Sequence, residues 1–301
     1  MKNRKHCIAL FAIAIAAFAG TQALAQGCVA AHSNQRPMGE LVKSYDSASY
    51  GGLSIHNLTL DVGYRVFNSN KYFQGTNEIA RPTAVENHQN IFDIGLTYRL
   101  TPRWSLIADI PIYNGTRNQI YPPSGIYQVS GLGDISIGAQ SWLFRPPTEN
   151  GGNIAVSASL KIPTGINNAT GSGLYHGQII KATADQSMQP GDGGWGFAIG
   201  SQAYKSLWHS SALYAEGQYL FNPEDTNNVA TFRSQAGQGV MSVTDQYLFR
   251  GGLSQGVPKV RGLALSLGVR GEGVPVRDLL GDSNGFRRPG SIISLDPGLM
   301  F

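Results

Sequence analysis

Hydrophobic and polar residues alternate with a period of two in ten separate segments of the chain. In one of these segments Phe92, Ile94 and Leu96 alternate with Asp93 and Gly95. Such alternation is typical of β-strands that have one apolar and one polar face. The segments are 58–66, 92–100, 104–113, 134–144, 154–162, 195–204, 212–221, 246–254, 263–272 and 292–301. The pattern therefore predicts ten strands.

No long segment shows helical spacing, and after the N-terminus no run reaches the roughly 18 apolar residues of a transmembrane helix. A soluble sandwich and a membrane barrel both alternate, so alternation alone leaves both folds open. The connections distinguish the two folds, because long polar connections alternate with short ones along the chain. The long ones are 68–91, 114–131, 163–193, 222–244 and 273–291. Long loops on one side and short turns on the other are typical of outer-membrane barrels, which implies an even strand count with both termini periplasmic.

Charged residues within these segments fall on the polar face and avoid the apolar face. A charge that faces lipid near mid-bilayer costs about 2–4 kcal/mol, so we expect the apolar face to meet lipid and the polar face to line a lumen. The residues expected to line it are Asp61, Arg65, Asp93, Arg99, Asp109, Asp134, Lys161, Glu216, Arg250, Arg270, Glu272 and Asp296. One acid, Asp245, falls in the outward phase, and we expect it at the loop edge.

The sequence ends on an aromatic residue, Phe301, in phase with Leu295 and Leu299. This ending resembles the C-terminal strand signal that the barrel assembly machinery reads in outer-membrane proteins. Together these features predict an all-β fold over residues 53–301: a transmembrane antiparallel up-and-down β-barrel of about ten strands. Such a barrel belongs in the outer membrane of a Gram-negative bacterium, in contact with its lipid and lipopolysaccharide.

Residues 1–25 have the layout of a secretory signal peptide: a basic start, an apolar run too short to span a bilayer, and a small-x-small site that ends at Ala25. We expect cleavage near Ala25. A lipid anchor on Cys28 is the alternative, and the preceding residues are a poor match to a lipobox. Residues 26–52 show no alternation, and we expect them to form either a periplasmic lead or a plug inserted from below.

Charge excludes nucleic acid as a partner. The formal net charge is +4, but the signal segment holds Lys2, Arg4 and Lys5 and no acid. The remainder carries 20 basic against 19 acidic residues, so it lacks the electropositive surface that binds phosphate backbones. Cys7 leaves with the signal segment, and the single cysteine that remains cannot form an internal disulfide.

Five stretches, taken in order, resemble a known family. They are YRVFNSNKYFQGTNE (64–78), GLGDISIGAQSWLF (131–144), SLKIPTG (159–165), SVTDQYLFRGGLS (242–254) and GVPVRDLLGDSNGFRRPG (273–290). They are similar to the outer-membrane family named after the MetA pathway of phenol degradation. The resemblance covers most of the mature chain. It implies an outer-membrane β-barrel linked to the passage of hydrophobic or aromatic compounds, and it leaves twelve strands open beside ten.

Outer-membrane barrels include lipases, deacylases and proteases, so the residue patterns of such enzymes bear on function. The histidines of the mature chain are His32 in the N-terminal lead, His56 just before the first strand near the periplasmic edge, His88 and His176 in predicted loops, and His209 in a short turn. None sits beside a serine at a strand top, as a Ser-His pair requires. No Cys/His cluster has zinc-like spacing and no phosphate-binding loop motif occurs. We therefore expect no enzyme, no cofactor and no metal.

The charges expected inside the barrel admit two interpretations. They pair across a narrow interior as structural salt bridges, or they line a polar channel and set its solute preference. The last long connection holds Arg277, Asp278, Arg287 and Arg288. It folds over the mouth as a constriction, or binds anionic lipopolysaccharide or solute groups through arginine forks. Alternatively it is an exposed loop that local ion pairs hold.

The pattern favours a passive channel for small compounds, with passage through the lumen or a lateral gap, and the family resemblance implies that these compounds are hydrophobic or aromatic. The alternative is a closed structural or adhesive barrel that acts through its extracellular loops. An outer-membrane lipid-modifying enzyme is the third hypothesis, and the missing catalytic pairs disfavour it.

Overall fold

The computed structural model describes residues 57–71, 73–74, 77–80, 85–144, 151–208, 210–258, 260 and 263–300. The expected signal peptide, Cys28, the segment 26–52, Phe301 and His209 lie outside the described residues, so their predictions stand as made.

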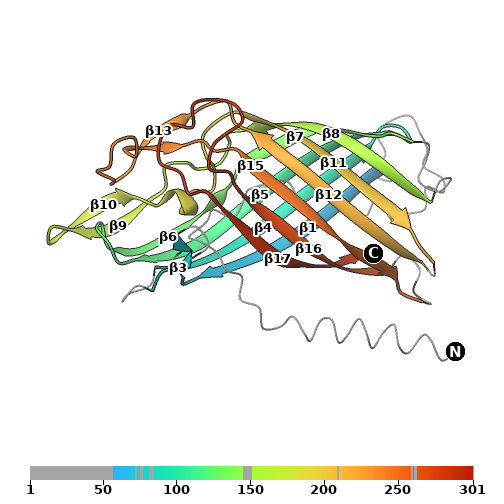
Figure 1. Cartoon of the computed structure of the whole chain (residues 1–301), viewed down its shortest axis with the longest axis horizontal. Coiled ribbons are helices and arrows are strands. Elements are labelled where there is room, and N and C mark those ends of the chain that lie inside the picture. Colours follow the sequence, from blue (N-terminus) through green and yellow to red (C-terminus); the bar gives the residue numbers. More distant parts are fainter. Residues whose placement is uncertain are drawn as a thin grey trace.

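Ten antiparallel strands follow one another in one curled sheet (Figure 1). Each predicted segment corresponds to one of them. In sheet order they are β1 (Leu58–Ser69), β4 (Glu86–Arg99), β5 (Trp104–Gln119), β7 (Ile135–Trp142), β8 (Gly152–Ile162), β11 (Gly196–Ser206), β12 (Ser211–Phe221), β15 (Gln246–Gly256), β16 (Ala264–Val274) and β17 (Gly290–Met300). The expected fold class is confirmed. No helix in the described part of the chain is long and apolar enough to cross a membrane.

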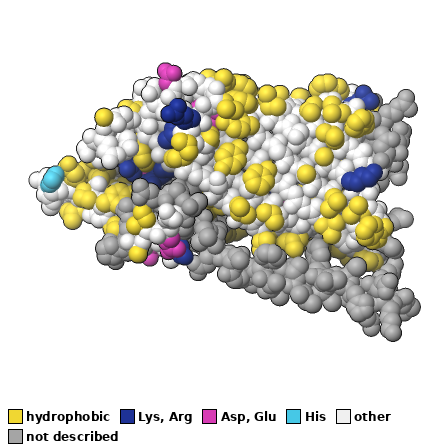
Figure 2. Space-filling view, viewed as in Figure 1, with side chains coloured by type: hydrophobic (Ala, Val, Ile, Leu, Met, Phe, Trp, Pro, Cys, Tyr) yellow, Lys and Arg dark blue, Asp and Glu magenta, His cyan; other side chains and the backbone are white. Residues whose placement is uncertain are grey.

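The sheet is polar on its concave face and apolar on its convex face. In β8, Ile154, Val156 and Leu160 are 41–44% exposed, whereas Ser157 and Lys161 are buried. On the face shown in Figure 2, apolar side chains spread over the strands, while charged side chains gather near the two ends. This polarity is the reverse of a soluble sandwich, in which the apolar faces meet in the core.

Further short strands stand at one end of the sheet, at the left of Figure 1, and short turns close the other end. They are β2 (Phe73–Gln74), β3 (Asn77–Glu78), β6 (Gly125–Leu132), β9 (Thr170–Tyr175), β10 (Gln178–Thr183), β13 (Thr226–Ala230) and β14 (Val240–Ser242). The expected loops 68–91 and 114–131 are thus partly strand, and His88 lies on β4. The start of β4 is polar in both phases, and β6 turns its apolar residues Tyr127 and Val129 inward, so neither follows the pattern of apolar residues outward that predicted the other strands.

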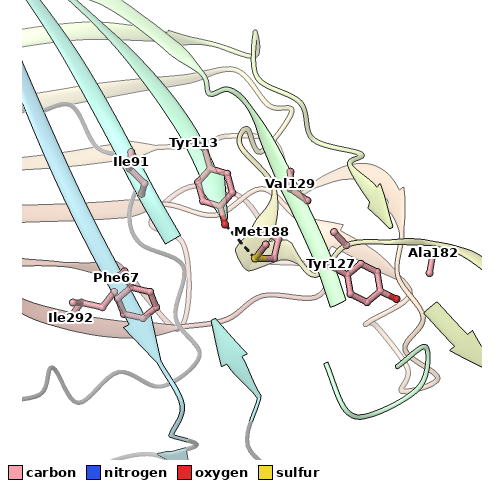
Figure 3. Close-up of a cluster of buried hydrophobic side chains, with 9 residues drawn as sticks. Phe67, Ile91, Tyr113, Tyr127, Val129, Ala182, Met188 and Ile292 are labelled. Carbon is pink, nitrogen blue, oxygen red and sulfur yellow. Dashed lines mark hydrogen bonds between the residues drawn. The ribbon is translucent and has the colours of Figure 1, made fainter. Parts of the chain in front are cut away.

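An apolar cluster fills the concave side of the sheet at this loop-bearing end (Figure 3). A 3₁₀ helix, η3 (Gln186–Met188), enters the mouth there, and Met188 is fully buried. The Tyr113 hydroxyl donates to the Met188 sulfur at 3.3 Å, and Gln89 Nε2 donates to the Ser187 carbonyl at 3.1 Å. Around Met188 the cluster contains Phe67, Ile91, Tyr113, Tyr127, Val129, Ala182, Ala184 and Ile292. The long connection between β8 and β11 therefore packs into the mouth through apolar contacts.

Asp134 joins three backbone segments at the break between β6 and β7. Its carboxylate accepts from the backbone N–H of Gly165 and of Asp192, both at 2.9 Å, and so holds the two ends of the connection 163–195. The segments approach so closely that a Cβ at Gly165 would lie 2.8 Å from backbone atoms of Gly133 and Gly191. The Gly-Asp motif at 133–134 is thus a packing junction as well as part of a strand pattern.

Replacing Gly133 with Ala is expected to destabilise the fold by about 1–3 kcal/mol, because the new Cβ would lie 2.8 Å from Pro111 and 2.9 Å from the Pro190 carbonyl oxygen. Gly217→Ala is the control, since a Cβ there meets no atom within 4 Å. The stability of each variant is measured by unfolding the refolded barrel in urea, with loss of heat-modifiable gel mobility as the readout. Equal midpoints for the two variants would contradict the junction.

Candidate functional site

All twelve residues expected to line the lumen lie in the concave phase of the sheet. Asp93, Asp109, Asp134, Lys161, Glu216, Arg250, Arg270 and Glu272 are buried there. Asp61, Arg65, Arg99 and Asp296 are half-buried in the same phase. The structure thus brings these side chains to one inner face.

Ion pairs join several of these charges. Arg65 forms a bidentate pair with Asp93, with Nε–Oδ2 at 2.8 Å and Nη2–Oδ1 at 3.0 Å. The Arg65 Nη1 also donates to Glu272 Oε2 at 3.1 Å, and Arg270 Nη2 donates to the same oxygen at 2.8 Å. This cluster connects β1 and β4 to β16, so it spans the two ends of the sheet.

A second cluster lies on neighbouring strands. Arg250 and Glu216 are directly opposite in the β12–β15 ladder, and the Arg250 Nε donates to Glu216 Oε2 at 2.7 Å. Asp296 of β17 lies 3.8 Å from Arg250 Nη1. Lys161 pairs with Asp192, with Asp134 3.9 Å away. Opposite charges thus neutralise one another along the inner face, as buried charges must.

β1 and β17 form a seam. In the residues that the structure describes, each pairs with one neighbour in the main sheet and no ladder joins them. Some outward side chains of these two strands are widely exposed: Val62 and Leu299 are 65% and 69% exposed. Pro297 of β17 has no N–H to donate toward either side.

A cavity of about 480 Å³ lies along the seam. Its rim is apolar, with Val62, Val66 and Leu295, and its floor carries Arg65 and Asp296. Arg65 crosses this floor to reach Glu272. The seam therefore connects the charged inner face with the apolar outer face, and an ion pair spans it.

The mouth residues separate into a local pair and a long-range one. Arg287 pairs with Asp278 within the connection 275–289, whereas Arg277 is exposed. Arg288 reaches Asp185, the N-cap of η3, through two hydrogen bonds of 2.7 and 2.6 Å. The segment that enters the mouth is thus η3, from the connection before β11. The arginine-rich connection 275–289, for which a constriction was one expected role, instead holds η3 in place through Arg288.

Asp245 lies one residue before β15, at the loop edge where we expected it, and is completely buried. Its carboxylate accepts from the backbone N–H of Asn222 at 2.7 Å and of Leu279 at 2.8 Å. The Tyr219 hydroxyl donates to the same group at 2.9 Å. One carboxylate therefore ties the connection after β12 to the connection before β17.

Ionic contacts at the mouth include residues that the sequence did not single out. Arg117 of β5 and Arg233 of the β13–β14 connection each place Nη2 at 3.7 Å from Asp185 Oδ2. Burial opposes the charge of Asp185, but Arg288 and Arg117 outweigh it and hold the pKa of this carboxyl well below its ordinary value. Long connections have no periodicity, so nothing local in the sequence indicates that these residues meet.

The described residues contain no group of three or more His, Cys, Asp or Glu side chains suited to a metal ion.

The search of solved structures finds an outer membrane channel from Pseudomonas putida F1, with 17% sequence identity, a TM-score of 0.51 and 77% of each chain covered. At this identity the similarity shows the fold. No family model matches the sequence. No curated protein matches it either.

The ionised Asp185 is expected to hold η3 throughout the neutral and mildly acidic range. A folded pKa below the unfolded one means that its stabilisation is present above about pH 4 and is lost only as the pH falls through the lowered folded value. Hydrogen exchange should show equal protection of residues 186–189 at about pH 8 and about pH 5.

Asp185→Asn should lower that protection about tenfold at both pH values, because charge-assisted hydrogen bonds to Arg288 are lost. Asp282→Asn, an exposed position in the neighbouring connection, is the matched control. A fall in wild-type protection between the two pH values would contradict the assignment.

Proposed function

We propose that this chain is an outer-membrane β-barrel channel for the passive passage of small compounds, hydrophobic or aromatic ones in particular. The observation that carries the proposal is the inverted sheet: ion-paired charges on the concave face and apolar residues on the convex face. A convex apolar surface suits lipid, and a charged face that lipid would penalise suits an interior. The likeness of fold to an outer membrane channel supports the same function.

The proposal includes location in the outer membrane. A signal peptide cleaved near Ala25 would export the chain, and Phe301 would present it to the barrel assembly machinery. Membership in the MetA-pathway family belongs to the proposal as well. It rests on the resemblance of the five sequence stretches, in which Asp134, Asp245 and Asp278 each accept a backbone hydrogen bond at the loop-bearing end.

The route that we propose for apolar compounds leads through the seam. The apolar cluster around Met188 occupies part of the straight path at the mouth, whereas the seam cavity has apolar side chains toward the convex face. A hydrophobic compound entering there would contact Val62 and Leu295 on the outer side, with the Arg65–Glu272 ion pair on the inner side of the same cavity. This route requires no catalysis and no cofactor, and we propose none.

The first test is single-channel recording in planar bilayers with the refolded mature chain. If ions pass along the inner face, Arg250→Ala leaves Glu216 without its closest partner and is expected to shift preference toward cations. Glu216→Ala is expected to shift it toward anions. Lys181→Ala, an exposed lysine of β10, is the control and should leave the reversal potential unchanged.

Current that appears only after deletion of residues 26–52 would identify that segment as a plug. Silence from correctly folded barrels in both forms would contradict an ion-conducting lumen and leave the seam route or a closed structural barrel. Acyl release from lipid substrates would instead support the enzyme hypothesis.

The seam route predicts that Arg65→Met increases entry of an apolar probe, because it removes the ion pair that spans the seam. An interaction of about 1–2 kcal/mol shifts an open-to-closed ratio by about 5–30-fold, so uptake of N-phenylnaphthylamine into cells should rise severalfold. Arg103→Met in an exposed turn is the control. Equal uptake in wild type and both variants would contradict the route.

A further inference from the structure

Three arginines from separate parts of the chain converge at the mouth on a single acid. Arg117 comes from β5, Arg233 from the β13–β14 connection and Arg288 from the connection before β17. Each places a guanidinium nitrogen within 3.7 Å of Asp185. Among the described residues, Asp185 is the only acid in ion-pair contact with any of the three. The cluster therefore holds an excess of two positive charges.

The arginines differ in how far their donors are used. Arg288 donates twice to Asp185, and Arg117 donates to Asn87 Oδ1 and to the Tyr121 hydroxyl, both at 2.6 Å. For the guanidinium of Arg233 the described residues supply no hydrogen-bond acceptor, and its ion-pair contact with Asp185 is at 3.7 Å. Burial, Arg288 and Arg117 together lower the pKa of Arg233, as expected for a cation among cations. The N–H groups of the Arg233 guanidinium are thus available to donate to an added anion.

Phe286 keeps Arg233 in position. The guanidinium carbon lies 3.7 Å from the centre of the Phe286 ring, a cation–π contact. Phe286 is itself fixed, because its N–H donates to Val240 at 2.7 Å and its carbonyl accepts from Ser242 at 2.9 Å. Gly285 before it has φ +85, and a Cβ there would meet Val240 and Ser242 backbone atoms at 3.0 Å, so glycine permits this pairing. Arg233 is therefore preorganised.

A cavity of about 280 Å³ opens beside this cluster. Arg233 and Asp185 line it together with apolar groups of Pro122, Pro123, Met241 and Phe286. Figure 2 shows basic side chains on the loop-bearing end of the molecule. The volume lies near the lower end of small-molecule sites and suits one aromatic ring with its substituent. The lining thus combines an arginine that makes no side-chain hydrogen bond to the described residues with apolar side chains over part of the wall, and polar side chains complete the rest.

We propose that this pocket binds a small organic anion, a carboxylate or phosphate carried on an apolar body of about one aromatic ring. The oxyanion accepts from Arg233 in a bidentate fork, and the ring packs on Met241 and the two prolines. The carboxylate or phosphate of the ligand adds negative charge to a cluster in which three arginines share only the carboxylate of Asp185. The site deepens the channel function proposed above, on which its role as a solute-selecting vestibule rests.

Calorimetric titration of the refolded full mature chain with benzoate, phenyl phosphate and inorganic phosphate tests the site. Benzoate or phenyl phosphate should bind, and Arg233→Gln should weaken that binding about tenfold or more, because it removes a charged donor pair. Arg277→Gln, an exposed arginine of the neighbouring connection, makes the same charge change and should bind as wild type. Equal weakening in both variants, or none in Arg233→Gln, would overturn the proposal.

Phe286→Leu provides a second variant that keeps an apolar wall but removes the ring under Arg233. It should weaken benzoate severalfold. Inorganic phosphate that binds as tightly as phenyl phosphate would overturn the apolar half of the proposal. Purified lipid A tests whether the bound oxyanion comes from a lipid headgroup or from a free solute. If lipid A displaces benzoate from the wild-type protein and binds far more tightly than benzoate, the oxyanion belongs to a lipid headgroup and the solute assignment is wrong.

Failure of this site and failure of the channel are distinguishable. Conductance in planar bilayers with no benzoate binding refutes the site alone. Arginine-dependent binding of benzoate to a barrel that passes neither ions nor apolar probe refutes the channel and leaves the site standing.

Discussion

Charged side chains enclosed by a curled sheet have to find partners inside it, because an unpaired charge away from water is very costly. Arg65 meets this constraint with Asp93 on the neighbouring strand and with Glu272 two strands beyond the seam. Those partners belong to opposite ends of the sequence. Neutralising the interior therefore also ties the first strand, β1, to β16 across the seam, where no described backbone ladder does.

Carboxylates perform a different task at the loop-bearing end. Asp134 and Asp245 accept from backbone N–H groups of connections that come from distant strands, and Asp185 caps η3 while it holds Arg288. A few charge-assisted hydrogen bonds thus order long connections that have little apolar surface of their own. The order matters for binding, since a pocket whose arginines are already fixed loses little entropy when a ligand arrives.

The two proposals use separate parts of this arrangement. The seam combines an apolar rim with an ionic floor, which suits compounds that avoid the charged interior. The pocket at the mouth combines an arginine with an apolar wall, which suits compounds that carry one anionic group. An aromatic acid has both features, so selection at the mouth and passage along the wall are compatible in one barrel.

The sequence by itself determined the strands of the sheet and the direction in which their side chains face. Alternation is a local property with a period of two, so it survives whatever the strands pair with, and all ten segments, with Asp93 and Arg250 in the inner phase, could be assigned from it. The full extents of the strands could not be assigned: the start of β4 is polar in both phases, and in β6 the apolar residues Tyr127 and Val129 face inward, the reverse of the other strands. Only the tertiary structure decided that η3 packs into the mouth, that Arg117, Arg233 and Arg288 meet at Asp185, and that β1 and β17 leave a seam. Arg288 and Asp185 are 103 positions apart, and Arg65 and Glu272 at the seam are 207 apart. Such contacts depend on how the sheet curls, which no local pattern encodes.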